Sequence, residues 1–280
     1  MSDDAAVAYL REVGKAADGA IDVAEAALHL ASFRRPRVAL GRYREHLAAL
    51  AGDVAAALGH EPEAPVAALT RRIEALRTAL VDKNGYRGDR LTYDDLQNAN
   101  LMRVIDRRRG LPVALGILYL HAARAQGWPM EGLAFPGHFL VRLAHGSARA
   151  IIDPFNEGTV LGPTALRELI KSAAGAKAEL APEHHAAVAN RAVLLRLHNN
   201  IKSRLIQNDQ IAEAVAVIEQ MQLFAPDEIG LWREAGLCHA RLDNLGAAIA
   251  ALESFIARSP QDSQRHESAA LLAQIRRRLN

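Results

Sequence analysis

A period of 34 residues near the end of the chain constrains the fold more than any other sequence feature. From about residue 195 onward, matching residue types recur at this spacing, and the matching pairs are Asp209 and Asp243, Ala214 and Ala248, Ile218 and Leu252, Met221 and Phe255, and Pro226 and Pro260. Units of this length bury their apolar faces only by stacking on their neighbours. The period therefore predicts two helical hairpins, followed by a capping helix over 263–279.

This period resembles the tetratricopeptide repeat. The second copy matches better, with its characteristic residues at Trp232, Gly236, Ala248, Phe255 and Pro260. The first copy departs from the pattern at Lys202, where a small residue is expected. The resemblance implies that residues 190–280 form tetratricopeptide hairpins whose groove binds a protein or peptide partner.

The middle of the chain combines one strongly apolar helix with two short strands. Residues 113–126 carry few polar side chains, and Pro112 suits the first position of a helix. Two apolar runs, 136–144 and 148–155, are separated by turn-forming residues. This pattern predicts a pair of antiparallel strands. Further helices are expected over 164–174 and 186–198.

Residues before this segment predict helices over about 21–30, 36–58 and from 65 onward, and then a polar loop over 84–100. We expect three regions. They are an N-terminal helical region over 1–84 that packs on the core, a core over 85–185, and the repeats over 190–280. The predicted fold class is α+β and mostly helical, with a small antiparallel sheet.

Three short motifs in the core resemble the transglutaminase-like (papain-like) fold. Gly110-Leu111-Pro112 opens the apolar helix, Gly137-His138 begins the first strand, and Asp153-Pro154 ends the second. In that fold a cysteine at the helix start, a histidine and an aspartate form a catalytic triad. The resemblance implies a degenerate triad of Pro112, His138 and Asp153, because proline has no nucleophilic atom.

The wider block is similar to a bacterial family with a transglutaminase-like core and tetratricopeptide repeats, described as regulator of SirC expression. The residues that carry this similarity are Gly85–Asp89, Tyr93, Asp94, Asn98, Leu101, Val104, Arg107, Arg109–Pro112, Leu118, Tyr119, Pro136–Arg142 and Asp153–Asn156. The similarity implies a regulatory role. It also makes Asn98, Arg109, Gly137 and Asn156 possible residues of a cleft beside the triad.

Two functions follow from these observations. The first is a non-catalytic cytoplasmic protein that binds a protein or peptide partner through the cleft and the repeat groove. The second is a hydrolase or acyltransferase that acts on amide bonds through His138 and Asp153, with an unidentified nucleophile or water. The proline favours a protein that is not an enzyme and leaves the second function open.

Composition argues against several other functions, namely binding of nucleic acid, spanning of a membrane and binding of a metal. A net charge of +2 gives no case for direct binding of nucleic acid, and no window is apolar enough to span a membrane. The single cysteine, Cys238, fits a reducing cytoplasm. The histidines lack the spacing of metal ligands, so neither a metal nor a cofactor is expected. Arg107, Arg108 and Arg109 are expected to form a solvated helix end. The sequence does not specify an oligomeric state.

Overall fold

The computed structural model describes residues 3–260 and 262–279, which form two compact units. Unit 1 contains Ala17–Leu197 and the residues up to Ala6, and unit 2 contains Val7–Ala16 and the chain from His198 onward. Helices α1 (Asp3–Lys15) and α8 (Asn190–Gln207) contribute residues to both units. Residues 7–16 thus group with unit 2, although the sequence places them in the N-terminal region. The three predicted regions stay predictions.

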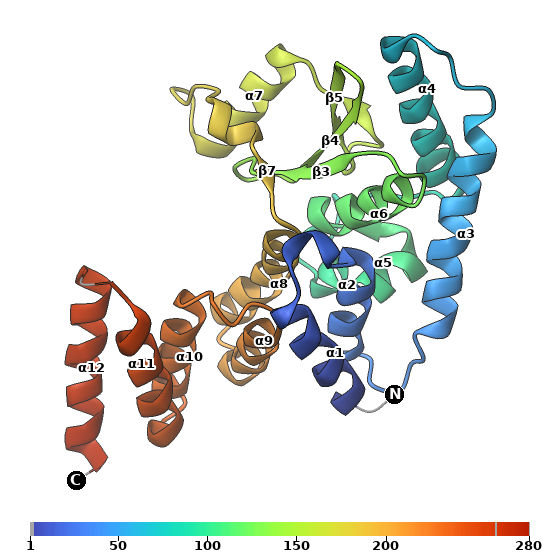
Figure 1. The fold of residues 1–280 in the computed structure, drawn as a ribbon. Coiled ribbons are helices and arrows are strands. Elements are labelled where there is room, and N and C mark those ends of the chain that lie inside the picture. Colours follow the sequence, from blue (N-terminus) through green and yellow to red (C-terminus); the bar gives the residue numbers. More distant parts are fainter. Residues whose placement is uncertain (1–2, 261, 280) are drawn as a thin grey trace. The chain divides into compact units, whose positions relative to one another are not determined.

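Unit 1 begins with helices α2 (Val23–Ser32), α3 (Gly41–Leu58) and α4 (Pro65–Arg77), as Figure 1 shows. The Asp22 carboxylate caps α2 by accepting hydrogen bonds from the amides of Ala24 and Glu25, both at 3.0 Å. Helix α3 starts five residues after Pro36. The intervening segment over 33–39 forms turns, in which backbone amides donate to carbonyl oxygens three residues earlier. A π-helical turn over Thr78–Lys83 extends α4.

A five-stranded antiparallel sheet lies at the centre of unit 1. Strands β4 (Leu140–His145) and β5 (Ala148–Asp153) are the predicted pair. The other strands are β3 (Met130–Leu133), β6 (Thr159–Val160) and β7 (Ala187–Val188), in the order β6-β5-β4-β3-β7. The sequence predicted a helix from residue 186. That prediction is wrong at its start, because Ala187 and Val188 pair with β3 and the helix begins at Asn190.

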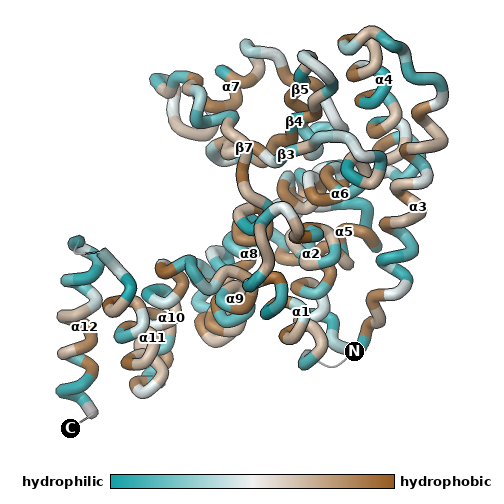
Figure 2. Tube along the Cα trace, viewed as in Figure 1, coloured by the Kyte–Doolittle hydropathy of each residue, from teal (hydrophilic) through white to brown (hydrophobic). Residues whose placement is uncertain are grey.

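Helices lie on either side of this sheet in Figure 1. Helix α6 (Pro112–Arg124) is the predicted apolar helix, and Gly116 on it lets the Phe139 ring approach closely. Helix α7 (Pro163–Ala174) covers the sheet through Leu166 and Ile170, which pack with Leu133 and other buried residues. Figure 2 shows brown, hydrophobic segments among more hydrophilic ones near α6, β4 and β5. These elements form the core that supports the candidate site.

Two very short strands pair in parallel just before α6. They are β1 (Arg87–Gly88) and β2 (Arg109–Gly110), and the register places Arg87 opposite Arg109. The segment between them contains a 3₁₀ turn over Leu96–Ala99 and helix α5 (Leu101–Arg107). The sequence predicted this region as a loop followed by a helix. The strand pair escapes sequence patterns because two residues show no periodicity.

Unit 2 consists of helical hairpins with the predicted period. Helices α9 (Ile211–Phe224) and α11 (Leu245–Arg258) begin and end 34 residues apart, and the turns before them contain Asp209 and Asp243 in the same left-handed conformation. Helices α10 (Gly230–Arg241) and α12 (Ser263–Leu279) complete the unit. The predicted fold class is confirmed: the chain is mostly helical with a small antiparallel sheet. No helix in the described part of the chain is long and apolar enough to cross a bilayer.

Candidate functional site

The structure brings His138 and Asp153 together. His138 Nε2 lies 2.9 Å from Asp153 Oδ1, and the two side chains are 13% and 1% exposed. His138 precedes β4 and Asp153 ends β5, so the antiparallel pairing of these strands sets the distance. The histidine and the aspartate of the degenerate triad that the resemblance implies are therefore in contact.

Asp153 also organises the turn that follows it. Its Oδ1 accepts hydrogen bonds from the backbone amides of Phe155 and Asn156, and its Oδ2 accepts one of 2.6 Å from Asn156 Nδ2. Burial alone raises the pKa of the Asp153 carboxyl, but the hydrogen bonds from His138 and Asn156 outweigh burial and lower it. The carboxylate is therefore charged at neutral pH and holds both the imidazole and the turn.

The backbone around His138 is fixed from two sides. Gly137 adopts φ +69°, and a Cβ at this position would lie 2.8 Å from the Cβ of Ala173. Arg196 Nη2 donates to the carbonyl oxygens of Phe135 and His138 at 2.9 and 2.6 Å. The imidazole is thus oriented, as a group that transfers protons requires. Its Nδ1 has no hydrogen-bond partner among the described residues.

Pro112 begins α6 and is buried. The preceding residue is held in place because the Leu111 amide donates to the carbonyl oxygen of Asn98 at 2.9 Å. Proline suits this position because the first amide of a helix has no partner within the helix. That Pro112 occupies the place of a nucleophile facing His138 stays a prediction from the family resemblance.

A pocket of about 500 Å³ opens between the strand pair before α6 and the turn after Asp153. We call it the arginine pocket, because three of its lining residues are Arg87, Arg90 and Arg109. The remaining lining residues are Gly88, Asp89, Leu91, Phe155, Asn156, Glu157 and Thr159. Asn156 connects the pocket to the His138–Asp153 pair, since it donates to the Asp153 carboxylate.

The acidic residues of the arginine pocket do not neutralise its arginines. The Asp89 carboxylate accepts hydrogen bonds from the Thr92 hydroxyl at 2.6 Å and from Arg107 at 2.9 Å. Neither of these partners is one of the three pocket arginines. Glu157 lies 4.0 Å from Arg87, and both side chains are about half exposed. Such an exposed ion pair contributes at most about 1 kcal/mol to the free energy of unfolding. The pocket therefore carries an excess of positive charge.

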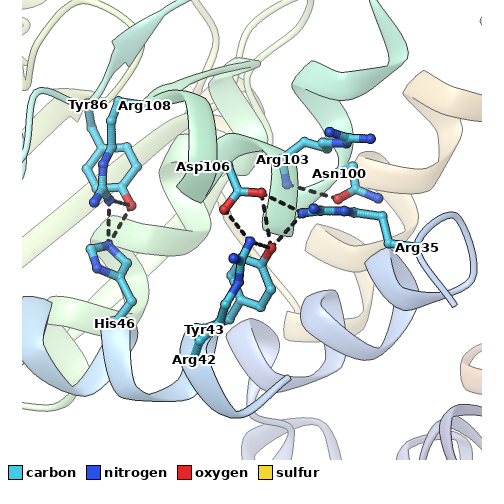
Figure 3. A network of polar contacts seen from close by, with 9 residues as sticks. All are labelled: Arg35, Arg42, Tyr43, His46, Tyr86, Asn100, Arg103, Asp106 and Arg108. Carbon is cyan, nitrogen blue, oxygen red and sulfur yellow. Dashed lines mark hydrogen bonds and ion pairs between the residues drawn. The ribbon is translucent and has the colours of Figure 1, made fainter. Parts of the chain in front are cut away.

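A polar network engages Arg108, the residue before Arg109 (Figure 3). Arg108 adopts the left-handed conformation at the end of α5, and its guanidinium contacts the Tyr86 hydroxyl and lies 2.6 Å from His46 Nε2. On the same helix, Asp106 accepts hydrogen bonds from Arg35, Arg42 and Tyr43. These contacts fasten α5 to α3 and fix the backbone that leads to Arg109.

The prediction that Arg107, Arg108 and Arg109 form one solvated helix end is wrong, because α5 ends at Arg107 and Arg109 belongs to β2. Arg107 donates to Asn98 and Asp89, both at 2.9 Å, and Arg108 belongs to the network of Figure 3. Arg109 instead lines the arginine pocket. The three adjacent arginines therefore lie in different environments. A run of three identical residues in the sequence gives no sign of this difference.

The four predicted cleft residues separate into two groups. Arg109 and Asn156 line the arginine pocket, whereas Asn98 is fully buried and Gly137 packs against Ala173. Sequence reasoning did not propose Arg87, Arg90 or Phe155 as site residues, although Arg87 and Phe155 belong to motifs that carried the family resemblance. Among the described residues no group of three or more His, Cys, Asp and Glu side chains is arranged to hold a metal ion.

Comparisons with known proteins agree with this architecture. Residues 41–199 match the model of the transglutaminase-like superfamily, and residues 201–276 match that of the tetratricopeptide repeat. A UPF0162 protein of Vibrio cholerae is 30% identical over 87% of this chain and 88% of its own length. Another from Xylella fastidiosa is 30% identical over 66% of this chain and 67% of its own length.

A third relative is protein SirB1 of Salmonella typhimurium, which is 27% identical over 68% of this chain and 71% of its own length. No solved structure matches the chain. The family model covers more than half of the chain, and the Vibrio relative is aligned over nearly its full length. The chain therefore belongs to the bacterial family that joins a transglutaminase-like domain to tetratricopeptide repeats.

Proposed function

We propose that this protein is a non-catalytic, cytoplasmic regulatory protein that binds a protein or peptide partner. The observation that carries the proposal is the chemistry at the start of α6. The first residue of this helix, where the family resemblance expects a nucleophile, is a buried proline with no group that attacks or titrates. The tetratricopeptide repeats support binding, because stacked hairpins present extended surfaces to partners.

The states of Asp153 and Cys238 are consistent with this role. Asp153 is engaged in holding the turn over 153–156 as well as His138, which gives it a structural use without catalysis. The only cysteine, Cys238, is buried on α10, and burial raises the pKa of its thiol. A raised pKa keeps a thiol protonated and unreactive.

The alternative is an amide-directed hydrolase or acyltransferase, which the oriented His138–Asp153 pair favours. An assay of amine incorporation and amide hydrolysis with the full chain separates the two functions. We expect no turnover above that of the His138→Ala variant. Turnover that disappears in this variant would establish the enzyme and refute the proposal.

Pro112→Cys tests the same point from the other direction. We expect this variant to remain folded at a cost of about 1 kcal/mol or less, because proline's advantage at this position is modest. We also expect no efficient acyl transfer, since catalysis requires oxyanion stabilisation in addition to a thiol. Rapid acyl transfer by Pro112→Cys would mean that the remaining machinery is complete.

Binding itself is tested by affinity capture from a native extract with the full chain as bait. A specific partner should be retained at stoichiometric levels and should be lost when surface residues of the binding region are changed. Failure to retain any specific partner over a denatured bait would count against the binding function.

A further inference from the structure

We propose that the arginine pocket binds the carboxylates of an acidic peptide segment in the partner protein, an inference that rests on the proposed binding function. The first observation is the register of β1 and β2. Arg87 and Arg109 are direct partners across the parallel pair, where strands lie about 4.8 Å apart. Like charges placed opposite each other in this way are unfavourable unless a counter-charge is present.

The second observation is the shortage of counter-charge inside the protein. Across residues 3–260 and 262–279, the Arg109 guanidinium has neither a hydrogen-bond nor an ion-pair partner. Arg90 contacts the neutral amide oxygen of Asn156 and stacks on the Phe155 ring with 5.8 Å to its centroid. Two of the three arginines thus face the pocket without an acidic partner.

The third observation is the support that these arginines receive. The amide of Arg87 donates to the carbonyl oxygen of Arg108, and the amide of Asp89 donates to that of Gly110, so the two strands are fixed relative to each other. Gly88 cannot carry a side chain, because a Cβ there would lie 2.5 Å from the Phe155 ring. Two arginines whose backbones are held side by side suit carboxylates, which arginine binds in a bidentate manner.

Size and neighbouring residues favour a peptide over a small ion. A volume of about 500 Å³ lies within the range of pockets that hold ligands much larger than one oxyanion. Leu91 lines the same pocket and is 97% exposed. A peptide with acidic and apolar side chains would contact both the arginines and this leucine. Inorganic phosphate would use the arginines alone.

The test measures binding of defined ligands to the full chain by isothermal titration calorimetry. The ligands are a glutamate-rich peptide that contains leucine, the same peptide with glutamine in place of glutamate, inorganic phosphate, and a short single-stranded oligonucleotide. The protein variants are Arg109→Gln, Arg87→Gln with Arg109→Gln, and Arg37→Gln. Arg37 is the matched control, because it is an exposed arginine of unit 1 that does not line the pocket.

We expect the glutamate peptide to bind, and the glutamine peptide to bind at least about tenfold more weakly, as loss of charge-assisted hydrogen bonds implies. Arg109→Gln should weaken binding of the glutamate peptide by about tenfold, the double variant should weaken it further, and Arg37→Gln should leave it unchanged. Equal affinity for both peptides would overturn the inference. So would equal loss in Arg37→Gln and Arg109→Gln, or binding of only phosphate or the oligonucleotide.

The failure of this inference can be told apart from that of the proposed function. If the native partner is captured equally by the wild-type chain and by the double arginine variant, the pocket is not the contact and the binding function stands. If the wild-type chain captures no specific partner, the binding function itself fails.

Discussion

Two fully buried tyrosines of unit 1 differ in the state of their hydroxyl groups. The Tyr86 hydroxyl lies 2.7 Å from His46 Nε2 and also contacts Arg108. The Tyr119 hydroxyl has no hydrogen-bond partner among the described residues. Burial raises the pKa of both phenols, that of Tyr86 to about 12. Removing a hydroxyl that lacks a partner removes a desolvation penalty, whereas removing a bonded one leaves its partners unsatisfied.

We therefore expect opposite effects from the same substitution at these two positions. Tyr119→Phe should leave the free energy of unfolding of unit 1 unchanged or raise it by about 1 kcal/mol, and Tyr86→Phe should lower it by about 1–3 kcal/mol. Urea titration followed by Trp128 fluorescence in a Trp232→Phe background measures this, since Trp128 belongs to unit 1. A large loss in Tyr119→Phe would indicate a water or ligand bonded to its hydroxyl.

Asp89 makes a specific contribution to stability that depends on pH. Its carboxyl pKa falls from 3.8 to about 2: burial raises the value, but hydrogen bonds from Thr92 and Arg107 prevail. A lowered pKa in the folded state stabilises the protein above the unfolded value, and this stabilisation disappears as the pH falls through the folded value. The contribution is about 2 kcal/mol above pH 4 and is lost towards pH 2.

Asp89→Asn should therefore lower the free energy of unfolding of unit 1 at neutral pH, and the difference from wild type should shrink between pH 4 and pH 2. Urea titrations at several pH values measure this difference. Asp82→Asn serves as the control, because Asp82 is exposed and has no hydrogen bond or ion pair among the described residues. A difference that is independent of pH would show that Asp89 acts through packing alone.

Residue motifs predicted the His138–Asp153 contact but not the arginine pocket. The contact follows from the resemblance of two motifs, Gly137-His138 and Asp153-Pro154, to those of the transglutaminase-like fold. The pocket depends on the pairing of Arg87 with Arg109, which are separated by a turn and a helix. The family resemblance singled out Arg109 as a cleft residue, but no local pattern reveals the environments of Arg107 and Arg108, which depend on residues distant along the chain.

At the scale of single elements, the close approach of α10 and α11 depends on Gly236. A Cβ at this position would lie 2.7 Å from Cγ of Leu252 and 3.4 Å from its backbone nitrogen. Gly236→Leu should therefore separate the helices at a cost of roughly 1–3 kcal/mol or more. Thermal unfolding followed by Trp232 fluorescence in a Trp128→Phe background measures the effect in unit 2.

Gly246→Leu is the matched control for that substitution. Gly246 lies on α11 in the same unit, is exposed, and has no atom within 4 Å of an added Cβ. This variant should retain or raise the melting temperature, because leucine favours a helix more than glycine does. Equal destabilisation by both substitutions would mean that the helices do not approach at Gly236.

Elements with strong periodicity were predictable, and short elements were not. The helices of unit 2 follow the 34-residue period, and the pair β4 and β5 follows its apolar runs. Strands β6 and β7 have two residues each, and their pairing depends on the neighbouring strand. The sequence predicted a helix from Pro36, because proline suits the first position of a helix. In the structure residues 33–39 form turns, and α3 begins only at Gly41.

At the scale of the whole molecule, chain order and compact units do not coincide. Residues Val7–Ala16 group with the chain from His198 onward. The amphipathic pattern of a helix does not tell which other helices it packs against. Within unit 2 a Cβ at Gly14 would collide with the carbonyl oxygen of Leu223 and would lie 3.4 Å from Cδ of Pro226. The start of the chain thus packs against the end of α9.

Gly14→Leu should consequently destabilise unit 2, although it lies at the opposite end of the sequence from the repeats. Overpacking against backbone costs roughly 1–3 kcal/mol or more, and each kcal/mol lowers the melting temperature of a unit of this size by about 4–8 °C. Trp232 fluorescence in a Trp128→Phe background reports the melting of unit 2. Gly52→Leu on α3 is the control, because Gly52 is a helical glycine with open space around it. If Gly14→Leu and Gly52→Leu leave the Trp232 transition equally unchanged, the first helix does not belong to the folded repeat unit.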